Sequence, residues 1–129
     1  MAKYVTDTIL DEALSYLKNN ADQIVLCDGQ PANYSDATTD SGSGGNALGE
    51  GAVDSSDFSL ADGDSSGRKV TVAQQTGITI DVDGTWDHVA IIDDGNSELL
   101  LVSTVSSQTA TAGNTATVNA FDEEIADAS

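Results

Sequence analysis

The chain has 129 residues, enough for a single domain spanning 1–129 and too few for a second core. It carries 22 acidic residues against 4 basic ones, a formal net charge of −18, so its field repels nucleic acid and anionic membrane surfaces alike. Aromatic residues make up only 5% of the chain, and we therefore expect a core of Val, Ile, Leu and Ala.

The N-terminal residues lack the pattern of a secretory signal. Met1 to Lys3 is followed by a mixed stretch with early acidic residues and no apolar segment. No apolar run approaches the ~20 residues needed to span a bilayer. Cys27 is the single cysteine, so an internal disulfide cannot form. These features predict synthesis and folding in a cytoplasm.

Residues 7–19 predict an amphipathic helix. Asp7 or Thr8 suits its start. Its apolar positions fall on one stripe at helical spacing and comprise Ile9, Leu10, Ala13, Leu14 and Leu17. We expect the stripe to pack on the domain's own sheet, and the alternative is a helix that binds a partner.

A short apolar strand at 24–27 is followed by residues 30–57, a long stretch rich in Gly, Ser and Asp that predicts a loop. The stretch contains too little apolar surface to fold onto its own domain. We therefore expect it to order against neighbouring subunits, with Tyr34, Leu48 and Val53 as its interface anchors.

Residues 58–121 predict an antiparallel β region. Strands are expected at 58–61, 68–74, 77–82, 86–92 and 99–105, the last two joined by a hairpin turn at 93–96. Both strands of that hairpin are apolar on each face, so we expect them to lie centrally, with Ile92 and Leu101 in the core.

The end of the chain predicts an edge strand and a tail. Threonines at alternate positions in 108–118 favour an exposed edge strand. Residues 122–129 form an acidic tail whose start Phe121 and Ile125 can fix. The whole pattern predicts a mainly β (α+β) fold, an antiparallel β-sandwich or curved sheet, with one N-terminal helix packed on it and a long loop.

Asp62, Asp64 and Ser66 are weak candidates for a calcium site. Their oxygens alternate as at the opening of a calcium-binding loop, and Gly67 follows. The twelfth position is Ala73 in place of a bidentate Glu, and no flanking helices are expected. The favoured interpretation is a polar connection between strands, with no metal and no cofactor.

No pattern in the sequence indicates catalysis. His88 is the only histidine, and we expect it to be structural, on the same strand face as Trp86, Ala90 and Ile92. Cys27 and His88 formally allow a cysteine nucleophile, but no orienting group or oxyanion hole is indicated, and we expect an inert buried thiol. The chain is therefore predicted not to be an enzyme.

Three stretches give the chain a resemblance to small virion structural proteins of tailed bacteriophages, of the head decoration or capsid cement kind. They are 61–70, 88–94 together with 99–102, and 113–115 leading to 120–125. The resemblance implies a virion component attached to a larger lattice and assigns a role to no individual residue.

The expected function is accordingly that of a decoration or cement protein. It would stabilise the head shell by binding the major capsid protein or other virion subunits, as a homo-oligomer located in the virion. Two alternatives are a tail, collar or fibre-attachment protein of the virion and a calcium-dependent surface-binding module.

Overall fold

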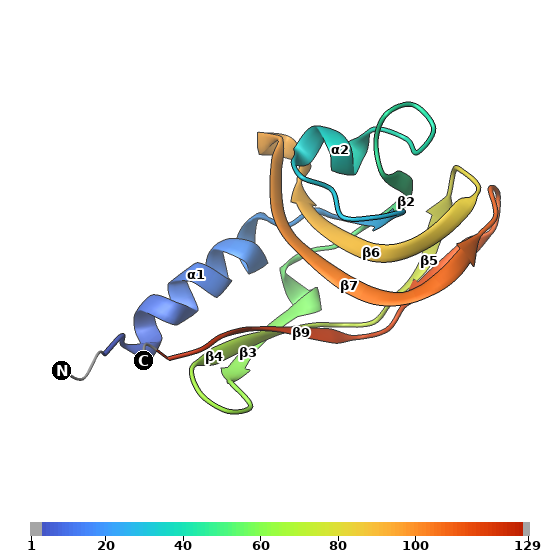
Figure 1. Cartoon of the computed structure of the whole chain (residues 1–129). Coiled ribbons are helices and arrows are strands. Elements are labelled where there is room, and N and C mark those ends of the chain that lie inside the picture. The colour runs from blue at the N-terminus through green and yellow to red at the C-terminus, as the bar shows by residue number, and fades with distance from the viewer. Residues whose placement is uncertain (1–3, 128–129) are drawn as a thin grey trace.

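Two antiparallel sheets and an N-terminal helix make up the fold in the computed structural model, which describes residues 4–127 (Figure 1). The larger sheet has six strands in the order β7-β6-β1-β2-β5-β8 and curls into a half-barrel, and the smaller has the order β3-β4-β9. The mainly β prediction with a packed helix is confirmed.

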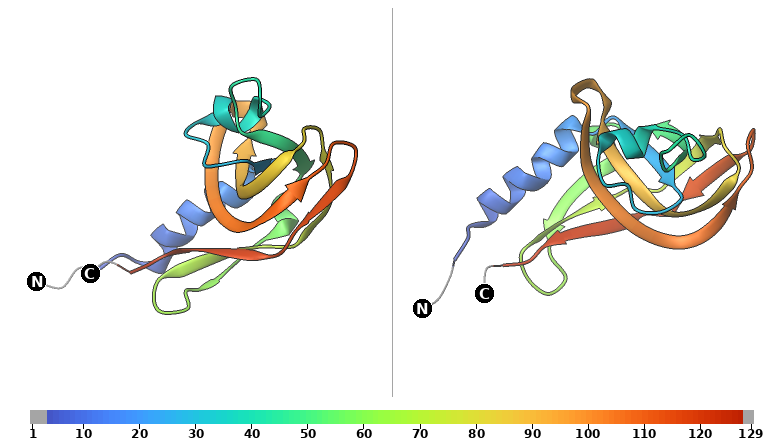
Figure 2. Two further views of the ribbon diagram at one scale, coloured as in Figure 1. Left: turned by 45° about the vertical axis from the view of Figure 1, so that its right-hand side comes forward. Right: turned by 45° about the horizontal axis from the view of Figure 1, so that its top comes forward.

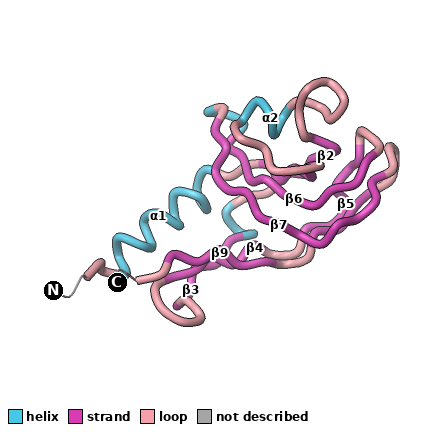
Figure 3. Tube along the Cα trace, viewed as in Figure 1, coloured by secondary structure: helices cyan, strands magenta, loops and turns pink. Residues whose placement is uncertain are grey.

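The elements follow one another along the chain as strands with three short helical segments between them (Figure 3). Their bounds are α1 Asp7–Asn20, β1 Gln23–Cys27, α2 Tyr34–Thr38, β2 Ala47–Ala52, η1 Ser55–Asp57, β3 Phe58–Asp62, β4 Arg68–Val72, β5 Gln75–Ile80, β6 Gly84–Asp93, η2 Asp94–Asn96, β7 Glu98–Ala110, β8 Thr115–Val118 and β9 Phe121–Ile125.

Helix α1 packs against β3, β4 and η1, as the apolar stripe predicted. Leu10, Leu14 and Leu17 are buried, which is the spacing of one helical face. Three details differ from the prediction. The N-cap is Thr6, whose side chain makes no capping hydrogen bond. Ile9 and Ala13, both expected on the apolar stripe, are exposed.

The prediction that 30–57 is a loop without its own packing is wrong. Helix α2, strand β2 and η1 lie within it, and β2 pairs with both β1 and β5. Leu48 and Val53 are buried in the chain's own core, and Tyr34 is half-buried. The segment therefore does have enough apolar surface to fold onto its domain, and Leu48 and Val53 do not face a neighbouring subunit.

The prediction of an acidic tail at 122–129 is also corrected. Strand β9 pairs in register with β4, from Val72 opposite Phe121 to Arg68 opposite Ile125. Phe121 and Ile125 pack against the core, as expected for the start of this segment. The last two positions, 128–129, lie outside the described residues.

The larger core cluster lies between the two sheets and α1. It contains Leu14, Ile24, Leu26, Leu48, Phe58, Val70, Val72, Ile78, Trp86 and Ile91, among others. The opposite face of the large sheet has a smaller core cluster under α2, made of Val25, Cys27, Ala37, Ala47, Ala90 and Ile92. Strands β1 and β6 are therefore buried on both faces.

Strand β7 does not lie centrally, contrary to the prediction. It forms an edge of the six-stranded sheet, hydrogen-bonded to β6 on one side only. Ile92 on β6 is fully buried as predicted, whereas Leu101 on β7 is only half-buried. Figure 2 shows the long curved β7, in orange, along the border of the sheet.

The alternation of side chains in β6 changes between Trp86 and His88. The register of β6 with β7 shifts at this point, so that three residues of β7, 105–107, lie opposite Asp87 alone. Trp86 consequently packs in the larger core cluster with Ile91. In a regular strand His88 and Trp86 would lie on the same face. Because of the register shift they do not, and the prediction that they share a face is wrong.

Candidate functional site

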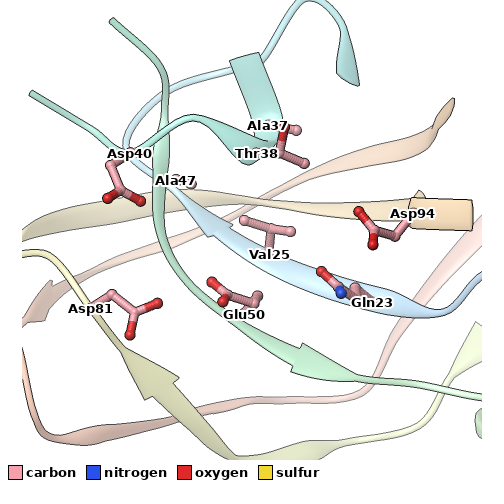
Figure 4. A pocket seen from close by; sticks show the side chains of 9 residues that line it. All are labelled: Gln23, Val25, Ala37, Thr38, Asp40, Ala47, Glu50, Asp81 and Asp94. Atoms are coloured by element: carbon pink, nitrogen blue, oxygen red, sulfur yellow. The ribbon is translucent and has the colours of Figure 1, made fainter. Parts of the chain in front are cut away.

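An acidic hollow of about 200 Å³ lies beside α2, over the paired strands β1 and β2 (Figure 4). It is lined by Gln23, Val25, Ala37, Thr38, Asp40, Ala47, Glu50, Asp81 and Asp94. Partial burial and the nearby charges of Asp81 and Asp40 raise the pKa of Glu50. The hollow therefore favours a proton on Glu50.

The acidic side chains do not converge on a metal position. Within residues 4–127, no group of three or more His, Cys, Asp or Glu side chains is arranged to hold a metal ion. In Figure 4, Asp94 lies at the other end of the hollow from Asp40 and Asp81. We therefore assign no ligand to this hollow.

The weak calcium candidates lie at the β3–β4 hairpin, where other groups contact their oxygens. Asp62 Oδ1 lies 2.5 Å from Arg68 Nη1, and Asp64 Oδ1 lies 2.8 Å from Lys69 Nζ. Ser66 Oγ accepts a hydrogen bond from a backbone amide in the C-terminal segment. The three side chains thus have different partners, and the structure does not bring them together around one point.

Cys27 and His88 are direct partners across β1 and β6, a proximity that their sequence positions do not indicate. Cys27 is fully buried, and burial, followed by the charges of Asp28 and Asp87, raises the pKa of its thiol to about 12. His88 Nδ1 lies 2.8 Å from Asp87 Oδ1. The thiol is therefore protonated at neutral pH and is a poor nucleophile.

A second hollow, of about 300 Å³, lies between β7 and the segment that joins β8 to β9. Its lining has no charged residue and comprises Trp86, Thr104, Val105, Ser106, Gln108, Val118, Asn119, Ala120 and Phe121. It borders the part of β7 that bulges opposite Asp87. Sequence reasoning missed it because the lining residues come from three separate segments.

The outer surface of α1 and the segment before it expose apolar side chains. In the part of the chain that the structure describes, the large hydrophobic residues classed as exposed are Tyr4, Ile9 and Tyr16, with 85%, 61% and 52% of their surface accessible. Ile9 and Tyr16 are seven positions apart and lie on one side of the helix. We call these three residues the α1 patch.

Tyr16 also connects α1 to the large sheet. Its hydroxyl donates a 2.6 Å hydrogen bond to Glu98 Oε1 at the start of β7, and this bond together with the glutamate charge raises the pKa of Tyr16. The ring itself stays half-accessible. The Tyr16 ring is therefore held in position while about half of its surface faces solvent.

Comparison of the chain with protein-family models, with curated proteins and with solved structures found no match. Among the described residues, no helix combines the length and the apolar character needed to cross a membrane.

Proposed function

We propose that the chain is a structural protein of a tailed-bacteriophage virion, a capsid decoration or cement protein that stabilises the head shell by binding neighbouring capsid subunits. The sequence resemblance suggests this class of protein. The α1 patch is the observation that supports attachment, because it exposes three large apolar side chains on a chain with a net charge of −18.

The position of the α1 patch suits a docking surface. Leu10, Leu14 and Leu17 fix one side of α1 on the domain, so the other side is presented on a rigid element. Burying Ile9 and the ring of Tyr16 against a shell subunit would remove apolar surface from water, at about 25 cal/mol per Å². Aromatic anchors of this kind commonly dominate binding energy at interfaces.

The acidity of the remaining surface is compatible with a place on the outside of a shell. A strongly negative protein does not bind DNA during packaging, because phosphate repels it. It also stays soluble before assembly. The apolar α1 patch then provides a short-range attraction that the general charge does not.

The test is co-sedimentation with shells that lack this protein. A double variant, Ile9→Gln with Tyr16→Gln, is expected to fold, because both side chains are exposed and the hydrogen bond of Tyr16 to Glu98 that it removes lies at the surface. It is expected to lose most of its attachment. The matched control is Thr109→Gln with Thr117→Gln, two exposed positions on β7 and β8, the two edge strands of the large sheet. If the control loses attachment and the α1 variant keeps it, the docking surface lies on β7 and β8 and not on the α1 patch.

The number of copies per particle tests the place in the virion. Hundreds of copies support a shell protein, whereas a few tens or fewer would contradict the decoration role and favour the tail, collar or fibre. Quantitative mass spectrometry of purified particles measures this number directly.

A further inference from the structure

Strand β7 has the sequence of a central strand and the position of an edge strand. Its first half is apolar on both faces: Leu100, Leu101 and Val105 pack toward the larger core cluster, and Leu99 and Val102 toward the smaller one. All five side chains are nevertheless only half-buried, because no strand lies on the outer side of β7. Such a strand is normally covered on each side and paired along each edge.

The free edge of β7 has few of the features by which proteins protect such edges. Edge strands are usually protected by charged residues, proline, bulges or a covering helix or loop. Strand β7 has bulges at Leu100 and at 105–107, and residues 101–104 between them are regular. From Leu99 to Phe121 this sequence contains no charged residue and no proline, although 20% of the residues of the whole chain are charged. The edge is thus open to another strand.

The absence of charge on this edge favours a second copy of this chain as the partner strand. A basic partner would be attracted to the acidic surfaces of the chain and not to this edge, because the uncharged strand provides no electrostatic attraction for it. Two copies of this chain, each with a net charge of −18, repel one another over most of their surface. They can approach with least repulsion where neither has a charge, and 99–110 is such a place.

The geometry points to pairing of β7 with β7 of a second copy, and we propose an antiparallel, two-fold symmetric contact between these strands as the self-association site of the protein. A two-fold axis normal to the sheet reverses the strand direction and keeps the direction of its curl. The curvature of β7, visible in Figure 1, is therefore the same in both paired strands. A flat partner strand would not match this curvature.

Pairing is centred on the regular part of the strand. Residues 101–104 are in unbroken register with β6, whereas the strand bulges at Leu100 and at 105–107. Beyond Thr104, β7 borders the uncharged hollow, whose other wall is the chain's own segment 118–121, so pairing is confined to the part of the strand before it. Each β7 would then lie between two strands, as its apolar sequence requires.

The experiment measures self-association of the free protein, without shells, by sedimentation velocity over a range of concentrations. Wild type is expected to pass from monomer to dimer and to associate more tightly in higher NaCl, which screens the mutual repulsion. Thr104→Asp places two like charges beside the axis and should weaken association at least about tenfold. Thr117→Asp, with the same change of charge on β8, should associate as wild type does.

Hydrogen exchange on the wild type provides a measurement that does not depend on a variant's folding. Amides of 99–104 should exchange more slowly at high than at low protein concentration, whereas those of β8 should not. A wild type that stays monomeric in high salt would overturn the proposal, as would loss of association in Thr117→Asp alone. Because shells are absent, failure here leaves the proposed attachment through the α1 patch untouched.

Discussion

Arg68 joins helix α1 to the three-stranded sheet through Asp11. Its Nε lies 2.7 Å from Asp11 Oδ1, and its Nη1 lies 2.5 Å from Asp62 Oδ1 on the neighbouring strand. The Arg68 side chain as a whole has 18% of its surface accessible, because its stem is covered by the neighbouring elements. Lys69, next along β4, similarly contacts Asp64 and Asp122. The central strand of this sheet thus places two of the 4 basic residues among the carboxylates around it.

We predict that Arg68→Gln lowers the free energy of unfolding by more than Lys18→Gln does, because two carboxylates lose their counter-charge and α1 loses its link to the sheet. Lys18→Gln removes the same charge in the last turn of α1 and should cost less than about 1 kcal/mol. Urea denaturation of both variants measures the difference. Equal losses would mean that total charge matters and the link between helix and sheet does not.

The free energy of unfolding should distinguish the two strands of the β6–β7 hairpin. Ile92→Ala removes a fully buried side chain and should cost about 2–5 kcal/mol. Leu101→Ala acts on a half-buried side chain and should cost about 1–2 kcal/mol in the monomer. Chemical denaturation at low protein concentration checks both values. The opposite ranking would place β7 inside the sheet.

Glu50→Gln should stabilise the protein at neutral pH, by less than about 1 kcal/mol because the side chain is partly exposed. The pKa of Glu50 is raised in the folded state, so the folded state binds more protons between the unfolded and folded pKa values. The stabilisation from protonation is therefore complete below the unfolded pKa and is lost as pH rises through the folded pKa.

Unfolding curves from about pH 4 to pH 7 measure this effect. The gain from Glu50→Gln should grow as pH rises through that window and vanish at its acidic end. Glu12→Gln, an exposed position on α1 with the same change of charge, is the control. A gain of equal size in the control would attribute the effect to net charge and would contradict a local role of the acidic hollow.

The thiol of Cys27 should react only after the protein unfolds. It is fully inaccessible, and burial raises its pKa to about 12, so almost no thiolate exists in the native state at neutral pH. A disulfide reagent such as Ellman's reagent should label the denatured chain at once. Labelling of the native chain should follow the rate of opening and stay slow up to about pH 9. Rapid native labelling would show that β1 opens locally.

The sequence predicted elements whose signal is local and periodic. The stripe that ends at Leu17 and the turn after Ile92 indicated α1 and the β6–β7 hairpin, and both are present. Strand β2 was missed because Gly49 and Gly51 resemble loop residues. A Cβ at Gly49 would lie 2.2 Å from the backbone oxygen of Thr79, so glycine is needed there for β5 to approach.

Other features depend on residues far apart in the chain. The acidic sequence of β9 resembles a tail. In the structure it pairs with β4, and Lys69 Nζ on β4 lies 3.1 Å from Asp122 Oδ2 on β9. The edge position of β7 depends on the order of the strands in the sheet, and the local sequence of β7 does not determine this order. The α1 patch was missed, because Tyr4 and Tyr16 lie outside the predicted apolar stripe and Ile9 was assigned to it.

The pairing of β9 with β4 has a consequence for the order of folding during synthesis. Val70 is fully buried in β4, yet the strand that pairs along one side of β4 follows β5, β6, β7 and β8 in the chain. Until that last strand emerges from the ribosome, β4 presents an unpaired border beside an apolar core. Closure over so long an intervening segment slows the final step of folding, and a nascent chain arrested before Phe121 should be the form that chaperones and proteases recognise.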